Sequence, residues 1–190
     1  MSSFEFELEP VNNSSGYGFR GEVGKFGNVD VCRDLRPVDG ITPKQVVLRG
    51  SHFPDVLFNG GAGGEPSLDG GWLRVDGKIV DMNLKVNGVR KGSRWLEVKH
   101  RDRDYTYGIA NKVVELRRGD RAIFIGRGKF VSGLGRMRSG RVQGDVDATD
   151  LAIALVLEVV DTSALSTLGA LLAAPATFLF RPRRDGGTPC

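Results

Sequence analysis

Apolar and polar residues alternate along most of the chain up to residue 146. Near the start, Phe4, Phe6 and Leu8 alternate with glutamates, and residues 80–86 repeat the pattern with Asp81 and Asn83 on the polar side. Alternation with a period of two is typical of β-strands that bury one face. Further short apolar runs lie at 46–48, 56–58, 72–75, 95–98, 105–109, 113–116, 122–125 and 142–146. The pattern therefore predicts about ten short strands.

Asp-Gly and Asn-Gly pairs separate many of these runs. They stand at 39–40, 59–60, 69–70, 76–77 and 87–88. Both residues of such a pair can adopt positive φ, which favours tight hairpins. Many short strands joined by tight turns predict an antiparallel sheet, closed as a barrel or packed as a sandwich. The glycine-rich segment 59–71 (NGGAGGEPSLDGG) is predicted to be a loop.

The pattern changes after residue 147. Residues 151–160 (LAIALVLEVV) are apolar on every side of a helix except at Glu158. Asp147, Thr149 and Asp150 precede them and can cap the free amides at the start of such a helix. A helix that is apolar all round has to be buried on all sides. The predicted fold is therefore mostly β, an antiparallel barrel or sandwich closed around an apolar C-terminal helix.

The segment that follows, 162–180, contains no charged residue and leads into the basic sequence 181–184. Three interpretations stay open: a second packed helix at 163–173 followed by an extended piece, a membrane anchor, or a segment that docks on another chain. We expect one β-rich domain over 1–161, the apolar segment 162–180, and a basic, then flexible tail at 181–190. The acidic start MSSFEFELEP predicts a cytoplasmic location, with peripheral membrane association left open.

Charge is segregated along the sequence. Residues 1–84 have a net charge of −4 and residues 142–190 of −3, whereas residues 85–141 contain 16 Lys/Arg and 5 Asp/Glu, a net +11. Such a concentration of like charge attracts anionic partners. The alternative is a solvated strand face paired with the acidic N-terminal third. The candidate anion-binding residues are Arg94, Lys99, Arg101, Arg103, Arg117, Arg118, Arg121, Arg127, Lys129, Arg136, Arg138 and Arg141.

Motifs for catalysis are incomplete. The G-x-G-x-x-G match at 16–21 precedes a strand-like run rather than a helix, and the His-Arg-Asp triplet at 100–102 lacks the rest of a kinase signature. Asp145 and Asp147 match a phosphatase-like D-x-D-x-T, but no lysine follows them. Cys32 has no His or Cys at metal-ligand spacing. We therefore expect no catalytic residue, no metal and no cofactor.

The order of the elements resembles the tubby-like superfamily, which includes phospholipid scramblases and LURP-one-related proteins. The similarity lies in strands of the form Tyr105-Thr-Tyr107 and Val114-Glu-Leu116, then a charged glycine-rich stretch and an apolar helix at 147–157 that opens with acidic residues. It covers about residues 95–160. The resemblance implies a closed barrel threaded by the helix, and phosphoinositide or other membrane binding or no known activity. It transfers no functional residue to this chain.

These observations favour a non-catalytic binding module whose basic segment 94–141 binds an anionic partner, with membrane lipid as the first choice. Charge reversal at Arg136, Arg138 and Arg141 is expected to abolish binding. One alternative is a structural or assembly protein that docks through 162–180. A further alternative is a single-stranded nucleic-acid binder, because aromatic residues lie among the basic ones. These aromatic residues are Trp95, Tyr105, Tyr107, Phe124 and Phe130.

Overall fold

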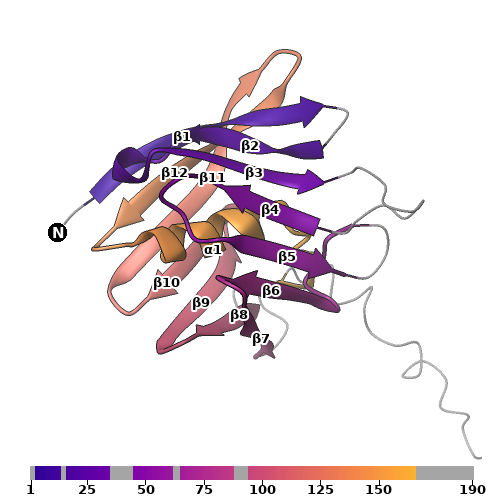
Figure 1. Ribbon diagram of the computed structural model, residues 1–190, viewed down its shortest axis with the longest axis vertical. Helices are drawn as coiled ribbons and strands as arrows, with labels where there is room; N and C mark the ends of the chain where they lie inside the picture. The colour runs from indigo at the N-terminus through magenta and orange to yellow at the C-terminus, as the bar shows by residue number, and fades with distance from the viewer. Residues whose placement is uncertain (1–2, 14–15, 35–44, 62–64, 88–93, 166–190) are drawn as a thin grey trace, which may run out of the picture.

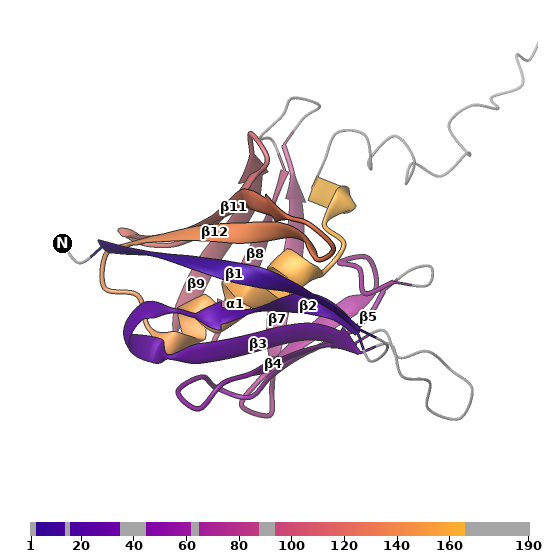
Figure 2. The ribbon, with the colours of Figure 1, turned by 90° about the horizontal axis from the view of Figure 1, so that it is seen from above.

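The computed structural model describes residues 3–13, 16–34, 45–61, 65–87 and 94–165. In this part of the chain, twelve antiparallel strands form a closed barrel around one helix (Figures 1 and 2). Each strand pairs with its neighbour in sequence, and β1 closes the barrel against β12. The strands are β1 (Ser3–Asn13), β2 (Gly16–Glu22), β3 (Asn28–Asp34), β4 (Gln45–Arg49), β5 (Val56–Gly60), β6 (Gly71–Val75), β7 (Lys78–Val86), β8 (Arg94–His100), β9 (Arg103–Ala110), β10 (Val113–Arg118), β11 (Arg121–Val131) and β12 (Gly135–Gln143). The predicted barrel is confirmed, and the sandwich alternative is excluded.

The alternation predicted from the sequence determines which side chains face the inside of the barrel. Phe6 and Leu8 of β1 are buried, whereas the glutamates between them are exposed. Phe6 lies opposite Gly140 where β1 closes against β12. A Cβ atom at Gly140 would stand 2.0 Å from Cζ of Phe6, so the closing pair needs a residue without a side chain here. Phe6 therefore reaches the core at the seam because its partner is glycine.

Among the described residues, the dipeptide signals mark a tight hairpin turn only at 76–77, and Asn59 and Gly60 belong to strand β5 instead of a turn. Asp76 and Gly77 both have positive φ, at 48° and 74°, and link β6 to β7 as the Asp-Gly pair predicted. The predicted loop 59–71 is shorter than expected, because its first two residues belong to β5 and its last to β6. The expected turns at 39–40 and 87–88 fall wholly or partly outside the described residues.

The helix α1 (Ala148–Val159) runs through the barrel, as expected from its apolar circumference (Figure 2). Every residue from 150 to 157 is buried, and the helix contacts strands β3 to β5 on one side and β10 and β11 on the other. Asp147 caps its start: its side chain accepts hydrogen bonds from the amides of Thr149 and Asp150. Asp150 in turn accepts from the Asp147 amide, which completes a capping box.

After the helix, the chain is held against the loop between β5 and β6. The amide of Asp161 donates to the carbonyl of Pro66, and the amide of Leu68 donates to the carbonyl of Asp161. A short 3-10 helix, η2 (Ser163–Leu165), follows. The predicted second helix, anchor or docking segment at 162–180 lies outside the described residues beyond Leu165, as does the tail 181–190. In the described part, no helix has the length and apolarity to cross a membrane.

Candidate functional site

The two ends of the barrel differ in how their basic side chains are used. We call the end at which α1 begins, with the turn 119–120, the Asp150 end. We call the opposite end, with the turn 132–134 between β11 and β12, the hairpin end. Figure 2 shows the helix running from one end to the other. The chemistry of each end follows from the side chains that face the helix termini.

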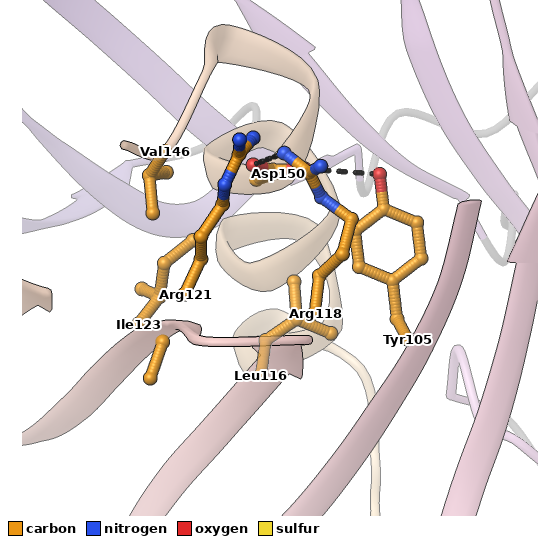
Figure 3. Close-up of a pocket in the computed structure, with 8 residues that line it drawn as sticks. Tyr105, Leu116, Arg118, Arg121, Ile123, Val146 and Asp150 are labelled. Atoms are coloured by element: carbon orange, nitrogen blue, oxygen red, sulfur yellow. Dashed lines mark hydrogen bonds and ion pairs between the residues drawn. The ribbon is translucent and has the colours of Figure 1, made fainter. Parts of the chain in front are cut away.

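At the Asp150 end, a cluster of charged and polar side chains surrounds the start of the helix. The Asp150 carboxylate accepts hydrogen bonds from Nε of Arg118 at 2.9 Å and from the Tyr105 hydroxyl at 3.0 Å (Figure 3). The Nη1 group of Arg103 lies 2.6 Å from Asp147 and 3.6 Å from Asp150. Asp150 is only 2% exposed, so these partners replace the water that its carboxylate would otherwise bind.

Burial, hydrogen bonds and neighbouring charges shift the pKa values of several groups in this cluster. Burial acts to raise the pKa of Asp147, but backbone hydrogen bonds and the nearby Arg103 guanidinium lower that pKa overall. The hydrogen bond to Asp150 raises the pKa of the Arg118 guanidinium. Burial raises the pKa of Tyr105 to about 12, so its hydroxyl stays protonated and donates to Asp150. The cluster therefore anchors the helix start with the charges already balanced.

The space beside this cluster is small. A depression of about 150 Å³, part of it open to solvent, is lined by Tyr105, Leu116, Arg118, Arg121, Ala122, Ile123, Val146 and Asp150 (Figure 3). Sites for small ligands usually enclose about 300–1,000 Å³. Three of its polar side chains, Tyr105, Arg118 and Asp150, are hydrogen-bonded to one another. We interpret this cluster as the anchor of the helix.

His100 lies at the same end and is buried. Its Nε2 atom has no hydrogen-bond partner in the described part of the chain. Burial lowers the pKa of its imidazole, and the neighbouring Arg101 and Arg103 lower that pKa further. The ring is therefore neutral at physiological pH. Among the described residues, no three His, Cys, Asp or Glu side chains gather in a way that could hold a metal ion.

At the hairpin end, the helix carries a single acidic side chain, and one arginine neutralises it. Nε of Arg138 lies 2.5 Å from the carboxylate of Glu158, and its guanidinium stacks 4.4 Å from the ring centre of Phe19. Burial raises the pKa of Glu158, and the charges of Arg138 and Arg127 offset part of that rise. Both side chains of the pair are mostly buried. Arg138 is therefore committed to the barrel interior.

Beyond this pair, β11 and β12 leave the barrel wall together. Pairing of β11 with β10 ends at Ile125, and pairing of β12 with β1 ends at Arg138. Further out, the two strands pair only with each other, through a bulge, as far as Val131 and Gly135. We call residues 126–137 the free hairpin; it projects at the top of Figure 1. Among the described residues, no neighbouring strand pairs with it on either side.

The free hairpin carries cations without acidic partners. Arg127, Lys129 and Arg136 form no ion pair with any described carboxylate, although Arg136 donates a hydrogen bond to the carbonyl of Gly128. The whole stretch 121–144 contains six Lys/Arg and no Asp or Glu. Near the tip, Phe130 is 68% and Leu134 47% exposed. The free hairpin thus combines unneutralised charge with exposed apolar side chains.

The twelve basic residues predicted from the sequence do not form one continuous face. Seven have a carboxylate within 4.0 Å: Lys99, Arg101, Arg103, Arg117, Arg118, Arg121 and Arg138. Arg94 donates to the carbonyl of Ala164. Four have no acidic partner in the described residues: Arg127, Lys129, Arg136 and Arg141. Three of these four lie on the free hairpin, and Arg141 faces outward opposite Glu5 of β1.

The acidic partners come mostly from elements other than those expected. Asp147, Asp150 and Glu158 belong to α1 and its cap, and Asp145 lies just before them. Among the described ion pairs of the twelve, the acidic N-terminal third supplies only Asp76, which binds Arg101. Most acidic partners of these basic residues therefore do not come from the N-terminal third. They come from the helix and the residues just before it, because the helix runs through the barrel and places its carboxylates beside the basic strands.

Two features of the barrel interior were not predicted from the sequence. Tyr105 and Tyr107, considered as surfaces for base stacking, are buried, and their hydroxyls bind Asp150 and the carbonyl of Leu157. They are not available for stacking on nucleic acid. Inward-facing arginines were also missed, although the strand alternation contains the signal. Each continues the inward phase of its own strand: Arg103 with Tyr105, Arg118 with Leu116, Arg127 with Ile125 and Arg138 with Val142.

No family model, curated protein or solved structure matches the chain. The closed barrel around a helix is the architecture that the resemblance to the tubby-like superfamily implied. The relationship itself stays a prediction, because no match tests it. The functional argument therefore rests on the geometry of the two barrel ends.

Proposed function

We propose that the protein is a non-catalytic binding module that attaches to anionic membrane lipid through the free hairpin. The observation that supports this proposal is the unneutralised charge of Arg127, Lys129 and Arg136 on an element that projects from the barrel. No acidic residue occurs in 121–144 to oppose an anionic surface. Under this proposal the protein associates peripherally with the membrane.

The expected strength of the attraction is moderate. A cation near an anionic membrane surface contributes about 1 kcal/mol, so three contribute on the order of a 100-fold gain in affinity. Such charges are screened within about 8 Å at physiological ionic strength, so the electrostatic part should weaken as salt is added. Arg138 is not counted, because Glu158 already neutralises it.

Basic residues at the Asp150 end are poorer candidates. The guanidinium groups of Arg103 and Arg118 are turned to the carboxylates of Asp147 and Asp150, and both arginines are only half-exposed or less. Recruiting Arg118 to a lipid phosphate would take the closest cation away from the buried Asp150 carboxylate, which costs several kcal/mol. Recruiting Arg103 would break its pair with Asp147. The net positive field of those strands is therefore largely neutralised within the molecule.

The test is sedimentation of the full chain with phosphatidylcholine vesicles, with and without phosphatidylserine. The triple variant Arg127→Glu, Lys129→Glu, Arg136→Glu should lose at least about 100-fold in affinity for the phosphatidylserine vesicles. The matched control reverses three exposed lysines at the Asp150 end, Lys25, Lys78 and Lys99, and should bind nearly as the unmodified chain does. Binding that is independent of phosphatidylserine, or equal losses in both triple variants, would contradict the proposal.

Two other functions, docking on another chain and nucleic-acid binding, are less well supported than lipid binding. Docking of another chain through 162–180 stays a prediction, since this segment is described only as far as Leu165. Nucleic-acid binding is less favoured, because Tyr105 and Tyr107 are buried. Filter binding of the full chain to a random single-stranded oligonucleotide tests it. Affinity equal to that for the anionic vesicles would favour a general anion binder over a lipid binder.

A further inference from the structure

The tip of the free hairpin exposes apolar side chains that folding would normally bury. Phe130 is 68% exposed and Leu134, in the turn, is 47% exposed. Neither packs against the hydrophobic core of the barrel. Exposed phenylalanine contributes nothing to stability through burial, which would otherwise be worth about 1.5–3 kcal/mol for a side chain of this size. Two such residues close together at the end of a projecting hairpin offer an apolar contact to a partner outside the described molecule.

Charged and apolar groups are layered along the free hairpin. Phe130 lies opposite Arg136, and Leu134 lies at the turn beyond them. Arg127 and Lys129 stand on the incoming strand, closer to the barrel, and Arg136 on the outgoing strand. A strand rises about 3.3 Å per residue, so Lys129 and Arg136 lie within roughly 10 Å of the turn 132–134, and Arg127 lies about 15 Å from it. Apolar groups that lie in the membrane interface penetrate about 5–10 Å, the same distance scale.

Lysine and arginine have the reach for this arrangement. Their aliphatic stems can lie along apolar surface while the charged ends stay among polar groups. With the tip at the boundary of the acyl chains, the guanidinium and ammonium groups would lie at the depth of the lipid phosphates. The apolar tip followed by cations on the free hairpin therefore matches the acyl chains followed by phosphates in an anionic bilayer.

A folded protein partner fits this tip less well. Stable protein–protein interfaces bury about 800 Å² on each partner, and usually centre on a well-packed apolar cluster. The free hairpin instead offers two apolar side chains at the end of a two-stranded element flanked by cations of one sign. Charge complementarity with phosphate groups and the small apolar area both favour a bilayer as the occupant.

We propose that the free hairpin inserts Phe130 and Leu134 into the boundary between the headgroups and acyl chains of an anionic bilayer, with Arg127, Lys129 and Arg136 on the lipid phosphates. The inference rests on the proposed function and adds an apolar contact to it. Membrane binding then has a component that salt does not screen, and the hairpin end of the barrel faces the membrane.

The first test removes the apolar side chains and keeps the charges. The double variant Phe130→Ser, Leu134→Ser is compared with Ile79→Ser in vesicle sedimentation at physiological ionic strength. Ile79 is a matched control, because it is 66% exposed and lies on β7 near the Asp150 end. We expect about a tenfold loss of affinity for each hairpin residue removed and none for Ile79→Ser. Urea unfolding of each variant verifies that the barrel is intact.

The second test reports insertion directly. Leu134→Trp and Ile79→Trp are mixed with phosphatidylserine-containing vesicles whose lipids carry brominated acyl chains, and fluorescence is compared with that of the unmodified chain, which supplies the background of Trp72 and Trp95. Added quenching and a blue shift are expected only for Leu134→Trp.

Two outcomes separate this inference from the proposed function. If the unmodified chain binds the vesicles, Leu134→Trp is not quenched and the double serine variant binds normally, then insertion is wrong and the proposed function stands. If the unmodified chain shows no phosphatidylserine-dependent binding, both are wrong.

Discussion

The two ends of the barrel receive arginines from neighbouring strands, β9 and β10 at one end and β11 and β12 at the other, and use them in opposite ways. At the Asp150 end, Arg103 and Arg118 face inward and bind the carboxylates that cap the helix. At the hairpin end, Glu158 neutralises Arg138, and the cations of the free hairpin form no ion pair with a described carboxylate, although the charge of Arg127 acts on Glu158 from a distance. The difference shows that a basic residue becomes structural or available according to the acids that the helix brings to it.

A substitution at Asp150 should have the largest effect on stability. Asp150→Asn removes the charge that Arg118 binds most closely and leaves its mostly buried guanidinium with only Asp147, at 3.7 Å, so we expect a loss of about 3 kcal/mol in the free energy of unfolding. Urea unfolding measures it. Asp145→Asn is the control, because Asp145 is 82% exposed in its side chain and 4.0 Å from Arg121, and it should cost less than about 1 kcal/mol. Equal effects of the two variants would remove the distinction between anchored and surface acids.

The Glu158–Arg138 pair should come next in magnitude. Glu158→Gln and Arg138→Gln each leave one partly buried charge unpaired, so each should cost about 2 kcal/mol. The double variant should cost less than the two single variants together, with a coupling energy of about 0.5–3 kcal/mol. A double-mutant cycle by urea unfolding measures this coupling. Strict additivity would mean that the pair is not an interacting unit.

The free energy of unfolding should fall in two steps as the pH is lowered, because two groups at the Asp150 end have lowered pKa values. Burial lowers the pKa of His100, so the unfolded chain takes up a proton near pH 6.5 while the folded protein does not; stability falls as pH drops below about 6.5. The pKa of Asp147 is also lowered, so its contribution is present above about pH 3.9 and is lost as pH falls through its folded value. His100→Gln should remove the upper step, as measured by the urea midpoint against pH. His52→Gln, at an exposed position, should retain it.

The smallest effect on stability is expected at the free hairpin. The Arg127→Glu, Lys129→Glu, Arg136→Glu variant and the Phe130→Ser, Leu134→Ser variant should change the free energy of unfolding by no more than about 0.5 kcal/mol, because these side chains make no ion pair and are not in the core. The measurement is the same urea titration. A loss above about 1 kcal/mol would show that the free hairpin supports the barrel, and would end the contrast between the two ends.

Much of the fold could be read from local patterns. Alternation around Phe6 and Leu8, the Asp76-Gly77 turn and the caps at Asp147 and Asp150 are all confirmed. Their signals are local, because side-chain period, turn backbone and helix capping each depend on a few consecutive residues. The turn at Asn111 and Lys112, where both residues have positive φ, carried no glycine signal and could not be located in the same way.

The candidate site depended on contacts between distant residues. Arg117 and Arg118 are adjacent and chemically identical, yet one lies outward beside Glu115 and the other inward on Asp150, 32 residues further along the chain. Strand phase decides which of the two points inward, and that much was present in the sequence. Which acid an inward arginine meets depends on the helix that passes through the barrel.

The alternating strands, the buried helix and its cap follow from local sequence, because each arises from hydrophobic periodicity or from hydrogen bonds between near neighbours. Which cations remain free depends on how distant elements pack together. Barrel closure pairs β1 with β12 as far as Arg138 and leaves residues 126–137 projecting, and α1 delivers its carboxylates to some strands and not to others. Charge neutralisation acts through space over a few ångströms, so it follows the path of the folded chain and not the order of its residues.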